Sequence, residues 1–229
     1  MIPSVALTTT AKRAPELAPL ARAHGLQPVV LPCIAVLPAS DAVLEQARRA
    51  VAYSEWLLVT SARTVEYLWP HGQIPDVEVA AVGLRTAKAV TNAGGAVSLV
   101  GESGSVALMS EVAALVEQAT VCFPHGRGAD LSQLRVLEEV ARTVSTWEVY
   151  ATESIPPALD PVDAVAFGSP SAVEGWLRSR GLEDVVVGAI GETTGEALAE
   201  LGHPPDVVAD RPEYSELLER LSARVRDRK

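Results

Sequence analysis

The chain repeats itself at an offset of 108 residues. Aligned without a gap, residues 61–100 and residues 169–208 are identical at twelve of forty positions, where composition alone would give roughly three. The repeat places VAAVGLRTAKAVTNAG at Val79–Gly94 on VGAIGETTGEALAELG at Val187–Gly202. A repeat of this length predicts two similar domains, because the units of a solenoid are shorter.

Each copy reads as a buried strand, a glycine turn and an amphipathic helix. In the second copy an apolar run from Val185 to Ile190 precedes Gly191, and Ala197, Leu198 and Leu201 recur at helical spacing before Gly202. Thr193 or Thr194 is expected at the N-cap. The unpaired N–H groups at the start of such a helix form a ready site for an anion.

Strands and helices alternate along the chain, which predicts an α/β fold with parallel sheets and ligands at the carboxyl ends of the strands. Proline-marked connectors near 32–38 and 150–157 favour one domain inserted into the other, over a cut near residue 125 into consecutive halves. The expected parts are a discontinuous α/β domain of residues 1–33 and 155–229, an inserted α/β domain of residues 36–148, and hinge linkers at 33–36 and 149–155. We expect the two domains to vary in relative orientation.

Composition restricts the function classes. The net charge of −10, with no basic stripe, argues against a nucleic-acid partner. The sequence predicts no membrane partner and no signal peptide, and Cys33 and Cys122 are expected to be reduced and buried, so a cytoplasmic location is expected. The histidines lack metal spacing, phosphate and dinucleotide loops are absent, and the acid-rich helix from Glu213 is interpreted as a solvated face.

Several motifs, in order, resemble those of the uroporphyrinogen-III synthase family over essentially the whole chain. They are Thr60–Ser61 before a helix, AVGLRTA with Thr86, HGRG, EVYAT with Tyr150, AFGSPSAV with Ser169 and Ser171, and AIGETTGEAL with Thr193 and Thr194. The resemblance implies two flavodoxin-like domains with parallel sheets, joined by a two-stranded linker, with the N-terminal segment in the C-terminal domain. One departure is Gly168, which stands where the family has a hydroxyl residue.

The resemblance also implies a reaction in tetrapyrrole and heme biosynthesis. The substrate would be hydroxymethylbilane, a linear tetrapyrrole with eight carboxylates. Loss of its hydroxyl gives an azafulvene, a spiro intermediate follows, and ring D is inverted on closure. No metal and no organic cofactor are implied. A monomer is expected, and a transient contact with the preceding pathway enzyme is the further partner considered.

Candidate residues follow from that chemistry. Tyr150 is the candidate proton donor, because the family places a tyrosine in this setting and a phenol stays protonated at neutral pH. Carboxylate binding requires many hydrogen-bond donors and cations. The candidates are Thr10, Arg13, Thr60, Ser61, Thr86, Arg127, Ser169, Ser171, Thr193 and Thr194. For any single hydroxyl, a plain N-cap worth about 1 kcal/mol is an equal interpretation. Arg63 and Arg85 are lesser candidates.

Two other functions are compatible with a duplicated α/β chain. The first is a non-enzymatic two-domain clamp that closes on an anionic metabolite, which the duplication predicts equally well. The second is a two-domain nucleotide-sugar transferase, although those chains are usually longer and no nucleotide signature appears here.

Overall fold

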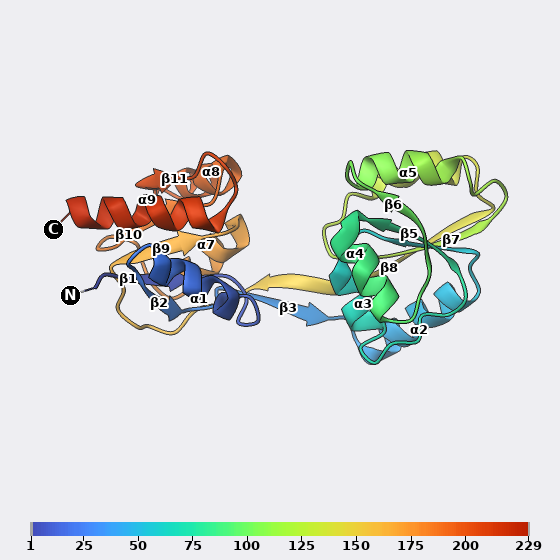
Figure 1. Ribbon diagram of the computed structural model, residues 1–229, viewed down its shortest axis with the longest axis horizontal. Coiled ribbons are helices and arrows are strands. Elements are labelled where there is room, and N and C mark those ends of the chain that lie inside the picture. The colour runs from blue at the N-terminus through green and yellow to red at the C-terminus, as the bar shows by residue number, and fades with distance from the viewer. Residues whose placement is uncertain (1, 229) are drawn as a thin grey trace. The chain divides into compact units, whose positions relative to one another are not determined.

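The computed structural model describes residues 2–228, and within them the chain forms two compact units. Unit 1 comprises residues 2–36 and 152–228, and unit 2 comprises residues 37–151. Each unit is a layered α/β structure, with a sheet covered by helices on both faces (Figure 1). The predicted α/β class is therefore confirmed, with two sheets whose strands are mostly parallel.

Unit 1 is built on a five-stranded sheet in the order β11-β10-β9-β1-β2, and all of its pairs are parallel. Counted along the chain, this is the flavodoxin order 2-1-3-4-5. Its elements are β1 (Ser4–Leu7), α1 (Ala14–Ala23), β2 (Gln27–Val30), β9 (Ala164–Phe167), α7 (Pro170–Leu177), β10 (Val186–Ala189), α8 (Glu192–Glu200), β11 (Val207–Val208) and α9 (Tyr214–Asp227).

Unit 2 contains a six-stranded sheet in the order β3-β8-β7-β4-β5-β6. Its strands are β3 (Ile34–Pro38), β4 (Trp56–Val59), β5 (Glu78–Val82), β6 (Val97–Gly101), β7 (Thr120–Gly126) and β8 (Thr143–Ser154). Its helices are α2 (Asp41–Ala52), α3 (Ala62–Leu68), α4 (Gly83–Asn92), α5 (Ser105–Ala113), η1 (Leu131–Leu134) and α6 (Arg135–Glu138).

The strands β3 and β8 run along the two connections between the units. Ile155 donates a backbone hydrogen bond to Cys33 at 2.8 Å, and Ala39 donates one to Val149 at 2.9 Å. These two bonds define an antiparallel pair. The unit boundaries fall inside both strands, at residues 36–37 and 151–152.

Apolar side chains on both faces of each sheet form the cores. In unit 1, α1 and α9 pack on one face through residues such as Leu17 and Leu217, while α7 and α8 pack on the other through Trp176 and Leu198. In unit 2, α2, α3 and α4 share one face, and α5 and α6 cover the other. Among the described residues, no helix is both long and apolar enough to cross a membrane.

The 108-residue offset relates most elements of one unit to the other. It places β4, α3, β5, α4, β6 and α5 on β9, α7, β10, α8, β11 and α9. The positions that β7 and β8 occupy in unit 2 are filled in unit 1 by β1 and β2 from the N-terminal segment. The two sheets therefore have the same arrangement of five strands, which the chain enters at different points.

Candidate functional site

The carboxyl ends of the strands carry the polar turns in both units. In unit 1 the strand order reverses between β9 and β1, and in unit 2 it reverses between β4 and β7. Parallel α/β sheets bind ligands in the crevice outside such a reversal, because the adjoining loops diverge there. A ligand site is therefore expected at the residues that follow these four strands.

The turn after β1 is held by its own threonines. The buried Thr8 donates its hydroxyl to the Ala166 carbonyl on β9 at 2.7 Å. The Thr10 carbonyl accepts from the backbone N–H groups of Arg13 and Ala14, each at 3.0 Å, and starts α1. The structure thus places the predicted residues Thr10 and Arg13 at the reversal, with the Arg13 side chain exposed.

Tyr214, at the first position of α9, also lies at this reversal. It is 6% exposed, and the Arg13 guanidinium lies over its ring, 5.3 Å from the centroid. Burial raises the pKa of the Tyr214 hydroxyl, while the Arg13 charge and a hydrogen bond with the Thr9 side chain act in the opposite direction. The interpretation of this helix as a solvated face was wrong for its inner side, where Tyr214, Leu217 and Leu221 join the core.

The turn after β9 leaves room for Tyr214. A Cβ atom on Gly168 would overlap the Tyr214 hydroxyl and lie 2.8 Å from its Cζ. Next to it, Ser169 caps α7 by accepting a hydrogen bond from Ala172 N at 3.3 Å, and Ser171 lies half-buried in the first turn. The phenol of Tyr214 therefore occupies the space that a side chain at position 168 would fill.

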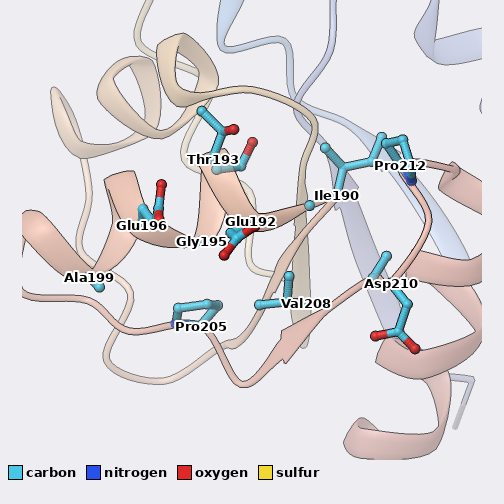
Figure 2. Close-up of a pocket in the computed structure, with 13 residues that line it drawn as sticks. Ile190, Glu192, Thr193, Gly195, Glu196, Ala199, Pro205, Val208, Asp210 and Pro212 are labelled. Atoms are coloured by element: carbon cyan, nitrogen blue, oxygen red, sulfur yellow. The ribbon is translucent and has the colours of Figure 1, made fainter.

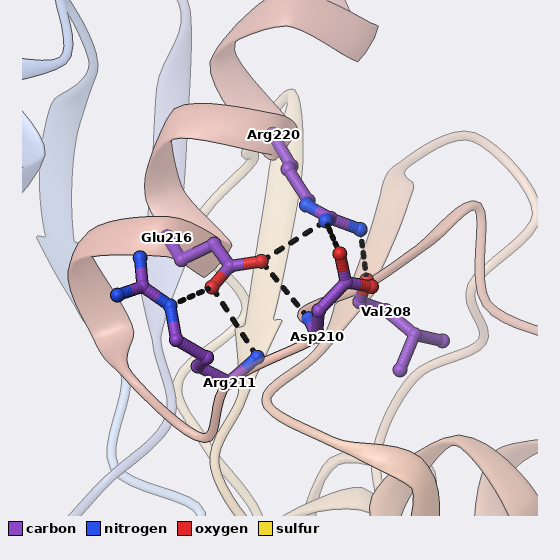
Figure 3. Close-up of polar contacts among 5 residues, drawn as sticks. All are labelled: Val208, Asp210, Arg211, Glu216 and Arg220. Atoms are coloured by element: carbon purple, nitrogen blue, oxygen red, sulfur yellow. Dashed lines mark hydrogen bonds and ion pairs between the residues drawn. The ribbon is translucent and has the colours of Figure 1, made fainter.

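A polar network fixes the loop that leads to Tyr214 (Figure 3). The Glu216 carboxylate accepts from the backbone N–H groups of Asp210 and Arg211, at 2.9 and 3.2 Å, and these bonds hold its pKa below the ordinary value. Arg220 pairs with Asp210 and Glu216 and donates to the Val208 carbonyl at 2.7 Å. The network joins β11, the loop and α9 within a few residues.

The turn after β10 opens onto a hollow of about 840 Å³ between α8 and the loop after β11 (Figure 2). Thr193 is exposed at its rim, whereas Thr194 is only 3% exposed. The N-cap prediction was wrong here, because Gly191 is the N-cap of α8 and no side chain caps this helix. The acidic side chains of Glu192, Glu196 and Asp210 line the hollow, and their charges oppose the binding of a carboxylate.

The turns of unit 2 repeat this design in part. Ser61 caps α3 by accepting from Arg63 N at 3.3 Å, and Thr60 is half-buried before it. Gly83 begins α4 with a φ of +72° after Val82, which provides no side-chain cap. Thr86 is 5% exposed inside the helix. Ser61 and Thr60 are therefore better exposed to a ligand than Thr86.

Tyr150 lies on β8 opposite Gly126, the last residue of β7. Its half-buried ring is 5.8 Å from the ring of Tyr67 on α3, and a Cβ atom on Gly126 would lie 2.6 Å from Tyr150 Cζ. Its carbonyl accepts from Arg127 N at 2.8 Å. The Arg127 side chain forms an ion pair with Glu148 at 2.9 Å on the exposed surface. Tyr150 is thus held at the carboxyl edge by α3 and β7.

Two residues at these carboxyl edges, Thr9 and Tyr214, are not among the candidates that the sequence predicts. Thr9 belongs to the run Thr8–Thr10 directly after a strand, so the pattern of a polar turn could have identified it. Tyr214 had no local signal, because the repeat aligns it with Val106, which is 67% exposed at the start of α5. Among residues 2–228 no group of three or more His, Cys, Asp or Glu side chains could hold a metal ion.

These features define a two-unit α/β protein with hydroxyl side chains and helix N-termini at the carboxyl edges of its sheets. The chain belongs to the family described as uroporphyrinogen-III synthase HemD, whose family model matches residues 15–219.

Solved structures agree with the fold. A mutant uroporphyrinogen III synthase from the extremely thermophilic bacterium Thermus thermophilus is 21% identical over 99% of both chains, with a TM-score of 0.55. The uroporphyrinogen-III synthetase from Helicobacter pylori 26695 is 18% identical over 96% of this chain and 98% of its own, with a TM-score of 0.61. A sequence search among curated proteins found no significant match.

Proposed function

We propose that the protein is a uroporphyrinogen-III synthase that cyclises hydroxymethylbilane with inversion of ring D. The observation that carries the proposal is the family match over residues 15–219, combined with hydroxyl turns at the strand reversal of each unit. The substrate carries eight carboxylates, and a linear chain of this kind closes to the wrong isomer without guidance. The protein therefore has to bind the carboxylates and assist the departure of water.

Carboxylate binding falls to the exposed or half-buried donors at the reversals. In unit 1 these are Thr10, Arg13, Ser169 and Ser171, and in unit 2 they are Thr60, Ser61 and Arg127. Thr193 adds an exposed hydroxyl at the start of α8, although the nearby carboxylates of Glu192, Glu196 and Asp210 weaken a carboxylate contact there. The buried Thr86 and Thr194 serve the binding indirectly, by packing the first turns of α4 and α8, whose backbone N–H groups face outward.

Tyr150 is the proposed proton donor. Its hydroxyl proton passes to the leaving hydroxyl of the bilane, the C–O bond breaks, and water departs, which leaves a protonated azafulvene and the Tyr150 phenolate. The substituted carbon of ring D then attacks to form the spiro intermediate, which fragments. The unsubstituted carbon of ring D closes the ring, and the proton that this carbon loses returns to Tyr150. The packing of Tyr150 against Gly126 and Tyr67 supports this role, because a ring fixed on two sides presents its hydroxyl in one orientation.

The test is turnover of hydroxymethylbilane followed by isomer analysis of the oxidised porphyrin. We expect the type III isomer from the protein and the type I isomer from the sample without protein. The Tyr150→Phe variant should lower kcat by about 10²-fold, at the lower end of general acid catalysis, and should retain isomer selectivity. Tyr53→Phe, at an 86% exposed tyrosine beyond α2, is the matched control and should leave kcat unchanged.

Two results would contradict the proposal. A product mixture identical to that of the sample without protein would exclude the synthase and leave a ligand-binding clamp. A Tyr150→Phe variant with the kcat of the wild type would remove Tyr150 from the chemistry, and would leave its ring as a packing element.

A further inference from the structure

Two arginines at the strand reversals differ in their partners. Arg127 in unit 2 is neutralised by Glu148 at 2.9 Å. Arg13 in unit 1 forms no ion pair with any acidic side chain in residues 2–228, and its guanidinium faces an aromatic ring instead. A ring supports the cation without cancelling its charge. Arg13 therefore keeps the full charge that a carboxylate ligand would pair with.

The ring of Tyr214 determines the position of the positive charge of Arg13. An arginine side chain at the surface samples many rotamers, and fixing it on binding costs free energy. Stacking over Tyr214 restricts the Arg13 guanidinium before any ligand arrives, at 5.3 Å from the ring centroid. The planar guanidinium suits this arrangement, since it can stack with one face and donate hydrogen bonds from its edge.

The position of Tyr214 is fixed from three directions. Its hydroxyl fills the space left by Gly168 and is hydrogen-bonded to the Thr9 side chain. The rest of its ring is buried in the core of α1 and α9. The network of Glu216, Asp210 and Arg220 holds the loop that precedes it (Figure 3). Because the Tyr214 ring is constrained in this way, it also restricts the position of the Arg13 guanidinium that lies over it.

We propose that Tyr214 is a positioning residue for substrate binding in unit 1, which holds the Arg13 guanidinium over the carboxyl ends of β1 and β9 in the geometry that pairs with a substrate carboxylate. The proposal rests on the proposed function, because it assigns Arg13 to an acidic tetrapyrrole. Gly168 is the complement of Tyr214, since any side chain at that position would displace the phenol and, with it, Arg13.

The experiment measures the binding of uroporphyrin III, a stable porphyrin octacarboxylate, by fluorescence anisotropy. We expect Arg13→Ala to raise Kd about tenfold, through loss of a charge-assisted contact. Tyr214→Leu should raise Kd about fivefold through loss of the stacked ring. Tyr214→Phe keeps the ring and should stay within about twofold of the wild type. In the Arg13→Ala background, Tyr214→Leu should have no further effect on Kd.

Variants at exposed residues distinguish a loss of binding caused by misfolding from one caused by a misplaced guanidinium. Arg13→Lys keeps the charge but loses the planar stack, and its side chain is exposed, so it should fold normally and still raise Kd about threefold. The matched control is Arg180→Lys, at the stack of Arg180 on Trp176 (4.3 Å), which follows the far end of α7. This control should leave Kd unchanged. Thermal melting of every variant identifies any that are unfolded.

The outcomes distinguish the two proposals. Unchanged Kd in both Tyr214→Leu and Arg13→Lys would overturn the positioning role, and so would additive effects of Arg13→Ala and Tyr214→Leu. Failure of the wild type to bind uroporphyrin III would overturn it as well. If the expected pattern of Kd values appears but the wild type forms no type III isomer from hydroxymethylbilane, the synthase assignment fails while the role of Tyr214 stands.

Discussion

The two units differ most where the repeat aligns different residues at the carboxyl edge. Unit 2 has Tyr67 on α3 and Val106 on α5, whereas unit 1 has Gly175 on α7 and Tyr214 on α9. Each unit nevertheless places one tyrosine against a glycine: Tyr150 on Gly126 in unit 2, and Tyr214 on Gly168 in unit 1. The duplication therefore preserved the backbone scaffold, while the aromatic contacts at the edge were rebuilt from elements that do not correspond.

The largest expected effect on the free energy of unfolding concerns the position at which the repeat aligns Tyr67 of unit 2 with Gly175 of unit 1. In unit 1 the backbone carbonyls of Cys33 and Ile155 occupy the space beside Gly175, and a Cβ atom there would lie 2.7 Å from the Ile155 oxygen and closer still to that of Cys33. Gly175→Ala should lower the free energy of unfolding by about 3 kcal/mol, because backbone atoms cannot yield as side chains do. Urea unfolding followed by tryptophan fluorescence measures it.

The control is the equivalent change in unit 2. Tyr67→Ala removes ring contacts with Tyr150 without creating overlap, and should lower the free energy of unfolding by about 1 kcal/mol. If Gly175→Ala proved as mild as Tyr67→Ala, the close approach of the two carbonyls would not be what requires glycine in unit 1.

A second comparison uses the one buried thiol in each unit. Burial raises the pKa of Cys33 to about 12 and that of Cys122 to about 11. Above pH 9 the unfolded chain releases thiol protons that the folded chain retains, so the free energy of unfolding falls with rising pH. The slope should reach about 1.4 kcal/mol per pH unit for each thiol.

Alanine variants separate the two thiols. Between pH 9 and pH 11, the free energy of unfolding should decrease less steeply with pH in Cys33→Ala and in Cys122→Ala than in the wild type. The contribution of Cys122 should level off first, near pH 11, because its pKa is the lower of the two. The measurement is a urea titration at several pH values. Identical slopes in the wild type and both variants would show that neither thiol contributes to the alkaline loss of stability.

The smallest expected effect concerns the matched glycines of the repeat. Gly83 has a φ of +72° and Gly191 a φ of 179°, and neither would bring a Cβ atom within 4 Å of a neighbour. Gly83→Ala should cost about 1 kcal/mol, because only glycine adopts the left-handed region without strain. Gly191→Ala should change the free energy of unfolding by less than about 0.5 kcal/mol. Equal effects would mean that the two turns do not differ in backbone strain.

Local pattern was sufficient for much of the molecule. The alternation of apolar runs with helical spacing predicted the parallel α/β class, and the offset of 108 residues predicted two similar units. Ser61 and Ser169 follow strand ends, and for both the structure contains the N-cap that was one of the two interpretations of each hydroxyl. The N-cap expected at Thr193 or Thr194 lies instead at Gly191, two residues before Thr193, and the helix has no side-chain cap.

The sequence by itself determined the elements, the repeat and the polar turns, because these depend on residues within a few positions of one another. Only the tertiary structure decided that Tyr214 packs against Gly168 and that the Arg13 guanidinium lies over its ring. These residues come from α9, the turn after β9 and the start of α1, which are far apart in the chain. Contacts of this kind depend on the packing of whole helices onto a sheet. No local periodicity encodes which side chain fills the space that a glycine leaves.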